Sequence, residues 1–302
     1  MKVISISRKA YEKLERMNFS KNVRNTEAVI YDYSTKRSPS SKIFKKLHHQ
    51  NGPVFANKLF TIEMLDSNKQ YLPNYFVIPD SLVTVGGVVQ GFTLPKIEGR
   101  NLADVLSEPS EPIENQIFYL KKVGHMLEQL DKIRRNTPLT DIYISDLHES
   151  NFIVNDKNHE LYVIDLDSCK IKDNQPTPSK YLTSKTLVNV VQGKYQFEEP
   201  DCPTYGYVIP DENSDLFCYT MMFLNYIYGD KITYFTLSEY YDYLDYLRVI
   251  GYSDEFINAL QTIVIPHKNI NIYPFLDELS SEQIYRSRES VYKYIQKKNK
   301  II

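Results

Sequence analysis

Two short segments of this chain combine residue types that can transfer a phosphoryl group. In the first, Asp146–Asn151, four residues separate an aspartate from an asparagine, and in the second, Asp165 follows the apolar run Leu161–Ile164. A hydroxyl that attacks the γ-phosphate of ATP needs a carboxylate to orient it and accept its proton, and the triphosphate needs Mg²⁺ held by oxygen ligands. The residue types and spacing therefore predict Asp146 as the catalytic base, with Asn151 and Asp165 as catalytic ligands of Mg²⁺.

The residues between these segments are expected to bring them together. Phe152–Val154 and Leu161–Ile164 read as strands joined by the polar turn Asn155–Asn158, so a hairpin would return the chain to the same place. Asp165 would then end a buried strand, where a carboxylate is costly unless a metal ion or another partner compensates it. Two alternatives remain open. Asp and Asn also form ordinary turns, and Asp165-Leu166-Asp167 also fits the D-x-D metal motif of a glycosyl-transfer site.

Both segments resemble the catalytic core of the protein kinase-like superfamily, whose members carry H-R-D-L-x-x-x-N and D-F-G signatures. Here the signatures read Ile144-Ser145-Asp146-Leu147-His148-Glu149-Ser150-Asn151 and Asp165-Leu166-Asp167. The resemblance covers roughly residues 26–265 and implies a bilobed α+β fold of the kinase-like type. A small N-terminal lobe, residues 1–95, would hold a β-sheet with one helix, and a larger, mainly helical lobe would span residues 96–302. It also implies an ATP-dependent kinase with ATP and Mg²⁺ as cofactors.

The N-terminal region carries strand patterns interrupted by one helical segment. Strands are expected at 27–33, 42–47 and 82–94, the last as a hairpin turning at Gly86-Gly87, and a helix at 54–65 with Val54, Leu59, Ile62 and Leu65 on one side. The resemblance implies that Lys45 binds the nucleotide phosphates and that Glu63, on the helix, is its partner. Lys46 is the alternative to Lys45, because strand side chains alternate between faces.

The short linker Pro95–Gly99 joins the two expected lobes, and the resemblance places the nucleotide against Leu94, Lys96 and Ile97. Beyond it, helices are expected at 101–106 and 114–135 and again from Ser214. The resemblance implies that Asp215, in the first turn of that last helix, accepts hydrogen bonds from the backbone of the loop that carries Asp146.

The chain also departs from the family pattern. Ser20–Thr26 contains no glycine where the family places its glycine-rich loop. Because glycines let backbone N–H groups approach the phosphates closely, one alternative is a pseudokinase that acts as a binding scaffold. At positions 148 and 167, His148 and Asp167 resemble the residues of small-molecule kinases of the aminoglycoside or sugar type. The helix start Ser214-Asp215 is more like that of protein kinases. The preferred interpretation is a serine/threonine protein kinase, with a protein substrate, or a small-molecule alcohol in the alternative case.

Composition excludes several classes of function. The 302 residues are 42% hydrophobic, the formal charge is −2 and both signs are mixed along the chain, so no nucleic-acid partner is expected. Cys169, Cys202 and Cys218 are far apart and predict neither a disulfide framework nor a zinc site, which suits the cytoplasm. The start lacks a secretory signal, and the longest apolar run, Tyr219–Tyr228, is about half the length of a membrane span, so no membrane partner is expected.

Overall fold

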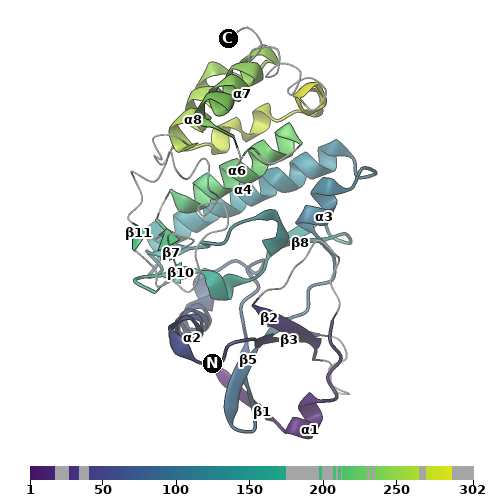
Figure 1. Cartoon of the computed structure of the whole chain (residues 1–302), viewed down its shortest axis with the longest axis vertical. Helices are drawn as coiled ribbons and strands as arrows, with labels where there is room; N and C mark the ends of the chain where they lie inside the picture. Colours follow the sequence, from purple (N-terminus) through teal and green to yellow (C-terminus); the bar gives the residue numbers. More distant parts are fainter. Residues whose placement is uncertain are drawn as a thin grey trace. The chain divides into compact units, whose positions relative to one another are not determined.

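The computed structural model describes residues 1–17, 27–33, 41–174, 197–198, 207–208, 210–211, 213–229, 232, 235–264 and 270–287. The chain is a mixed α+β protein (Figure 1) that separates into two compact units. The first unit is Met1–Asp104, Ile133–Ile142 and Ser150–Thr177, and the second is Val105–Lys132, Tyr143–Glu149 and Pro178–Ile302. This grouping differs from a single boundary after residue 95, because the hairpin that precedes Asp165 packs in the same unit as the N-terminal sheet.

A five-stranded sheet in the order β1-β4-β5-β3-β2 forms the base of the first unit. Its strands are β1 (Lys2–Ile6), β2 (Ala28–Asp32), β3 (Lys42–Leu47), β4 (Ser81–Val85) and β5 (Val88–Pro95). The predicted strands are confirmed, and the hairpin between β4 and β5 turns at Gly86 and Gly87 with φ of 60° and 82°, as a Gly-Gly turn requires. Strand β1 was not expected: it is largely exposed, pairs in parallel with β4, and leads through Ser7 into the short helix α1 (Arg8–Tyr11).

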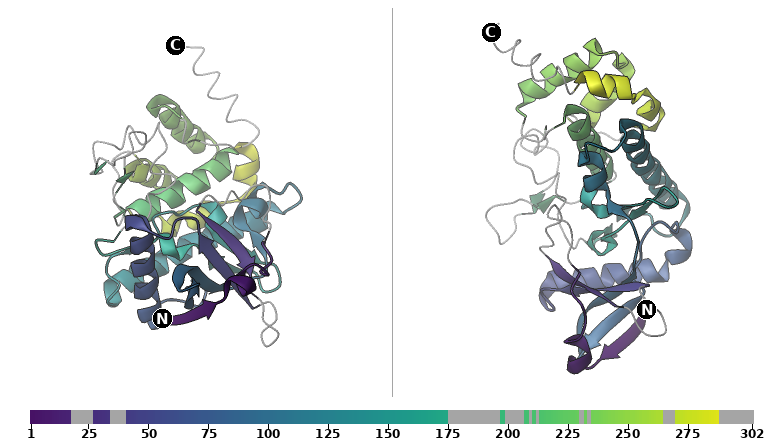
Figure 2. Two further views of the ribbon diagram at one scale, coloured as in Figure 1. Left: turned by 60° about the horizontal axis from the view of Figure 1, so that its bottom comes forward. Right: turned by 90° about the vertical axis from the view of Figure 1, so that its right-hand side faces the viewer.

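Helix α2 (Gly52–Ser67) packs on this sheet, with Pro53 in its first turn. Figure 2 shows α2 alongside the strands of the sheet, and Ile62 lies in an apolar cluster with buried residues of those strands. The predicted helix is confirmed, and the expected apolar side is confirmed at Ile62 and Leu65 but not at Val54, which is exposed. The buried stripe also contains Lys58 and Thr61. These four buried positions follow the i, i+3, i+4, i+7 spacing of one helix face. The hydrophobic pattern of the sequence does not reveal this face, because one of its four members is a lysine.

The first unit also contains a smaller sheet, further short strands and single turns. A three-stranded sheet has the order β6-β8-β9, with β6 (Arg100–Asn101), β8 (Phe152–Asn155) and β9 (Glu160–Val163). Two further strands are β7 (Ile142–Tyr143), part of which belongs to the second unit, and β10 (Lys170–Ile171). The turns are η1 (Lys69–Tyr71), η2 (Glu149–Asn151) and η3 (Leu166–Ser168). The predicted hairpin is confirmed as β8 and β9, in which Phe152 pairs with Val163.

The second unit is mainly helical. It contains the second half of α3 (Leu102–Ser107) and most of α4 (Ile113–Asn136), together with α6 (Ser214–Tyr228), α7 (Leu237–Val249), α8 (Asp254–Val264) and η5 (Tyr273–Glu278). The short strands β11 (Phe197–Glu198) and β12 (Tyr207–Val208) pair antiparallel. Helix α6 is buried along nearly its whole length: the Phe223 ring stacks on Phe256 at 5.8 Å, and the Tyr219 hydroxyl donates to the Leu120 carbonyl at 3.0 Å. The predicted helices are confirmed with bounds shifted by about one residue.

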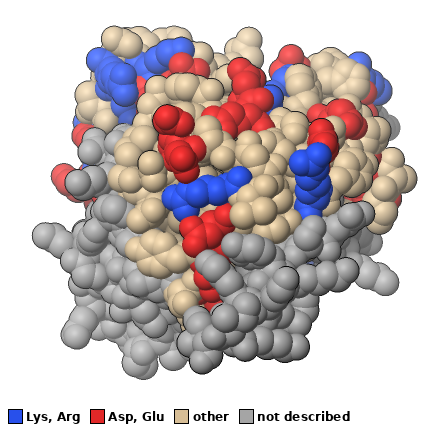
Figure 3. All heavy atoms as spheres, turned by 90° about the horizontal axis from the view of Figure 1, so that it is seen from above, with Lys and Arg blue, Asp and Glu red and all other residues tan. Residues whose placement is uncertain are grey.

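On the face of the molecule in Figure 3, Lys and Arg side chains lie among Asp and Glu side chains, and neither sign forms a continuous patch over the described atoms. This agrees with the mixed charge pattern of the sequence. Within the described residues, no helix is both long enough and apolar enough to cross a bilayer.

Candidate functional site

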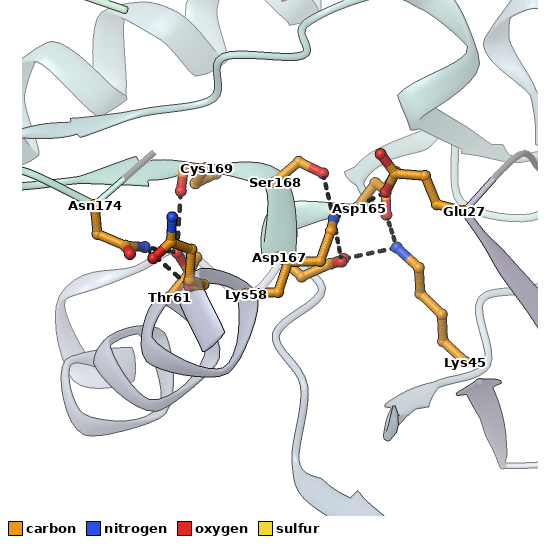
Figure 4. Close-up of polar contacts among 10 residues, drawn as sticks. Glu27, Lys45, Lys58, Thr61, Asp165, Asp167, Ser168, Cys169 and Asn174 are labelled. Atoms are coloured by element: carbon orange, nitrogen blue, oxygen red, sulfur yellow. Dashed lines mark hydrogen bonds and ion pairs between the residues drawn. The ribbon is translucent and has the colours of Figure 1, made fainter. Parts of the chain in front are cut away.

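Lys45 points from β3 into a buried cluster of charges (Figure 4). Its side chain is almost fully buried, and its ammonium group pairs with Asp165 and, at 2.8 Å, with Oδ1 of Asp167. The neighbouring Lys46 points elsewhere and lies 5.8 Å from the ring centroid of Tyr11. Of the two lysines that the sequence left open, Lys45 is therefore the one that the strand turns toward the carboxylates.

The helix residue that reaches this cluster is Lys58, and Glu63 does not. Glu63 lies on the exposed side of α2, so the predicted ion pair between Lys45 and Glu63 does not form. The reason is the position of the buried stripe: Glu63 is five residues beyond Lys58, which on a helix of 3.6 residues per turn places it on another side. Lys58 itself is 3% exposed.

Asp167 joins the two lysines. Its side chain is 1% exposed, and its Oδ2 lies 2.9 Å from Nζ of Lys58 while its Oδ1 contacts Lys45. Lys58 also donates to Oγ of Ser168 at 3.1 Å and pairs with Oε2 of Glu27 at 2.9 Å. In space the five charged groups alternate in sign, in the order Glu27, Lys58, Asp167, Lys45, Asp165, so each buried charge has neighbours of opposite sign.

Electrostatics keep the inner part of this cluster charged. Burial alone would favour the neutral form of Asp167, but Lys45 and Lys58 outweigh it and hold the pKa of Asp167 well below its usual range. Burial would likewise favour neutral lysines, but the nearby carboxylates Asp165 and Asp167 raise the pKa of both Lys45 and Lys58. At neutral pH both lysines are therefore cations.

Asp165 is held differently from Asp167. Burial, reinforced by the charge of Asp167 and opposed by Lys45, raises the pKa of Asp165 to about 6. Its side chain is 28% exposed, so it is the more accessible of the two aspartates. Its backbone has a left-handed conformation, φ 66°, which a residue other than glycine adopts at a cost of roughly 1–2 kcal/mol. Such strain is often found at functional positions.

Asn151 lies beside Asp165 along the backbone of the hairpin. The N–H of Ile164, the residue before Asp165, donates to the Asn151 carbonyl at 2.9 Å, and the paired strands β8 and β9 continue this contact. The Asn151 side chain is buried. The expectation that the hairpin returns the chain to Asn151 is confirmed. The two predicted Mg²⁺ ligands therefore belong to one local structure of the first unit.

Asp146 belongs to the second unit, in a loop fixed by Asp215. The N–H groups of Ile144 and Ser145 donate to the two carboxylate oxygens of Asp215 at 3.1 and 3.2 Å. Asp215 lies in the first turn of α6 and is 2% exposed, so its predicted role is confirmed. Ser145 has φ of 65°, and Nε2 of His148 lies 3.5 Å from Oδ2 of Asp146.

The residues predicted to contact the nucleotide occupy two environments. Leu94 is buried in the apolar cluster that holds α2 on the sheet, and Ile97 and Ile164 pack against the same cluster. The Lys96 side chain instead pairs with Asp32 of β2 at 3.1 Å. Leu94 thus lies inside the cluster, whereas Ile97 and Ile164, the residue before Asp165, are only partly buried against it.

Sequence reasoning missed Lys58 and Glu27, and it considered Asp167 as part of a D-x-D motif and as a feature of small-molecule kinases, but not as a partner of Lys45. The available signal was the spacing of Lys58, Thr61, Ile62 and Leu65, because a lysine on a buried stripe requires a carboxylate partner. Among the described residues, no group of three or more His, Cys, Asp or Glu side chains could hold a metal ion. A Mg²⁺ site built on Asn151 and Asp165 would therefore complete its coordination with phosphate oxygens and water, as Mg²⁺ sites commonly do.

Several predicted features fall on residues outside the described part of the chain. These are the segment Ser20–Thr26, the hydroxyl residues Tyr181, Thr183, Ser184 and Thr186, and Cys202. A comparison of the sequence with models of known protein families found no match, and a search of curated proteins found no significant relative.

Proposed function

We propose that this protein is an ATP- and Mg²⁺-dependent phosphotransferase that transfers the γ-phosphate of ATP to a hydroxyl group. The observation that carries the proposal is the buried contact between Lys45 of β3 and Asp165, the carboxylate that follows the β8–β9 hairpin beside Asn151. A cation and two oxygen ligands held together in this way suit a triphosphate with its metal ion.

Each residue has a role that follows from its surroundings. Lys45, which is charged at neutral pH, would bind the phosphates. Asp165 is partly exposed, so a metal ion can reach it, and Asn151 would be the second protein ligand. Asp146, in the loop fixed by Asp215, would orient the attacking hydroxyl and accept its proton. Rate enhancement would come mainly from positioning and from charges fixed in advance.

Leu94 belongs to an apolar cluster against which Ile97 and Ile164 pack, and these side chains would contact a planar base at the other end of the ligand. Because the Lys96 side chain is engaged by Asp32, we assign the base contact to Leu94 and Ile97 rather than to that lysine. The described cysteines, Cys169 and Cys218, are buried thiols, which suits a reducing compartment such as the cytoplasm.

A serine or threonine of a protein is the preferred acceptor. The contacts of Asp215 with the loop backbone support this choice. They involve the helix start Ser214-Asp215, which is more like protein kinases than like small-molecule kinases. One observation favours a second candidate, a kinase of small-molecule alcohols: Asp167 takes the place of the glycine of the protein-kinase signature, and it is buried between two lysines.

Labelled ATP tests the proposal directly. Wild type is incubated with labelled ATP and Mg²⁺ in three ways: with no acceptor added, with a panel of proteins, and with aminoglycosides and sugars. The label that is transferred to the protein itself or to each acceptor is then measured. The replacements Lys45→Met, Asp165→Ala and Asp146→Asn are expected to reduce transfer by about 100-fold or more. Lys46→Met is the matched control, since Lys46 neighbours Lys45 but lies over Tyr11, and it should retain transfer within about 3-fold.

The outcomes separate the candidates. Label on proteins alone supports a protein kinase, and label on an aminoglycoside or sugar alone supports the second candidate. Equal transfer by wild type and all of the variants would show that the site is assigned wrongly. If nothing is labelled and millimolar ATP with Mg²⁺ does not raise the melting temperature, the protein is a binding scaffold and not an enzyme, because a ligand stabilises according to its concentration over Kd.

A further inference from the structure

The side chain that fixes Lys45 does not come from the helix. Two carboxylates contact its ammonium group, Asp165 and Asp167, and both lie in the segment after β9. If a metal ion takes Asp165 as a ligand, Asp167 is the carboxylate that remains for Lys45. The lysine would then keep one fixed acceptor and could direct its other donors toward a phosphate.

Asp167 has little freedom to leave this position. One of its oxygens contacts Lys45 at 2.8 Å and the other contacts Lys58 at 2.9 Å, so rotation of the carboxylate would break both contacts. Its side chain is buried, and a buried carboxylate that lost a cation would not be compensated by water. The geometry of Asp167 therefore depends on Lys58 as well as on Lys45.

Lys58 is suited to hold Asp167 and not to bind a ligand. An ammonium group has three donors, and those of Lys58 are directed to Asp167, Ser168 and Glu27. Two further contacts fix the same face of α2 to the chain after Asp167. The Thr61 hydroxyl donates to the Cys169 carbonyl at 3.2 Å, and Asn174 donates to the Thr61 hydroxyl at 2.8 Å (Figure 4).

We propose that Asp167 is the positioning residue of Lys45 and that Lys58 positions Asp167, so that helix α2 contributes a cation to the nucleotide site where a carboxylate was expected. This inference rests on the proposed function, because it assigns to Lys58 and Asp167 an effect on the binding of the ATP phosphates. Neither residue touches the ligand. Both act through the direction of the Lys45 ammonium group.

Steady-state kinetics with ATP as the varied substrate test the inference. Lys58→Met and Asp167→Asn are each expected to raise the KM for ATP by about 10- to 100-fold, as the loss of a charge-assisted contact does. The KM for the hydroxyl substrate should not change. Lys58→Arg keeps the charge but not the shape of the ammonium group, so it should raise the KM less than Lys58→Met does. Lys69→Met, which removes an exposed lysine just beyond α2, is the control.

A double replacement guards against loss of folding. Removing both charges of a buried pair is often tolerated where removing one is not, so Lys58→Met combined with Asp167→Asn should fold at least as well as either single variant. Its KM for ATP should remain raised by about the same factor as in Asp167→Asn, because the contact to Lys45 is still missing.

The results distinguish this inference from the proposed function. If wild type transfers phosphate and the KM for ATP of Lys58→Met is unchanged, the inference is wrong and the function stands. The same holds if the variants lose kcat only in proportion to their folded fraction, because the pair would then be structural alone. If wild type itself neither binds ATP nor transfers phosphate, the proposed function fails and this inference fails with it.

Discussion

Two aspartates, one in each unit, are almost completely buried and are held by different kinds of partner. Asp167 of the first unit is 1% exposed and lies between the ammonium groups of Lys45 and Lys58. Asp215 of the second unit is 2% exposed and accepts hydrogen bonds from the backbone N–H groups of Ile144 and Ser145. The buried charge of Asp167 is therefore compensated by particular side chains, and the buried charge of Asp215 is compensated by the backbone of a loop.

This difference determines what each residue can control. Because the partners of Asp167 are side chains, a single substitution changes the charge balance of the cluster. Asp215 is instead hydrogen-bonded to main-chain N–H groups of Ile144 and Ser145, which only a proline would remove, and its place in the first turn of α6 adds a favourable interaction with the helix dipole. Asp215 therefore maintains loop geometry, while Asp167 maintains an arrangement of charges.

The largest effect is expected for Asp167→Ala. Removing one member of a buried ion pair typically costs about 3–5 kcal/mol of the free energy of unfolding, since the remaining charges lose their compensation. Urea unfolding followed by circular dichroism measures the change. Asp156→Ala is the matched control: Asp156 pairs with Arg100 at 2.7 Å on the surface, so its loss should cost less than about 1 kcal/mol. Equal costs for the two variants would contradict the comparison.

A smaller and more local effect is expected for Asp215→Asn. The amide has one acceptor oxygen, so one of the two backbone donors, Ile144 or Ser145, would lose its partner at a cost of about 1–3 kcal/mol. Hydrogen exchange with mass spectrometry should show faster exchange of the peptide that contains these residues, while the peptide of β3 keeps its rate. Unchanged exchange around residue 144 would mean that the loop does not depend on Asp215.

The smallest effect is the pH dependence of Asp165. Its pKa is raised to about 6, so the folded protein binds a proton more tightly than the unfolded chain does, and stability contributed by this group falls as pH rises from about 4 to 6. Asp165→Asn should match wild type near pH 4.5 and exceed it near pH 7.5 by about 1–2 kcal/mol, after allowance for partial exposure. Thermal unfolding at both pH values measures this. A variant that is less stable than wild type at pH 7.5 would show that Lys45 stabilises the ionised carboxylate more than burial destabilises it.

Local patterns in the sequence were sufficient for several elements of the fold. The apolar runs on either side of the polar turn Asn155–Asn158, the Gly86-Gly87 turn and the apolar run of α6 each come from neighbouring residues, and each element formed as predicted. The role of Asp215 was predictable from the resemblance of the helix start at Ser214-Asp215, together with the favourable place of an aspartate in the first turn of a helix.

The charge cluster was not predictable in the same way. It joins Lys58 to Asp167 over more than a hundred intervening residues, and the sequence alone does not show that a lysine faces the interior. Glu63 has the charge that the resemblance requires of α2, but it lies outside the buried stripe of Thr61, Ile62 and Leu65. Strand β1 was not predicted, although Ile4-Ser5-Ile6 alternates apolar and polar residues as its burial does.

Gly91 of β5 places a constraint on the position of Lys45 although it carries no functional group. A Cβ at this position would lie 2.0 Å from the carbonyl oxygen of Lys45, so any larger residue must push β3 away from β5. Movement of β3 would carry the Lys45 ammonium group away from Asp165 and Asp167. Substitutions at position 91 should therefore be as poorly tolerated as substitutions of Lys45, Asp165 or Asp167. A residue with no side chain would in this way restrict which sequences can keep the charge cluster intact.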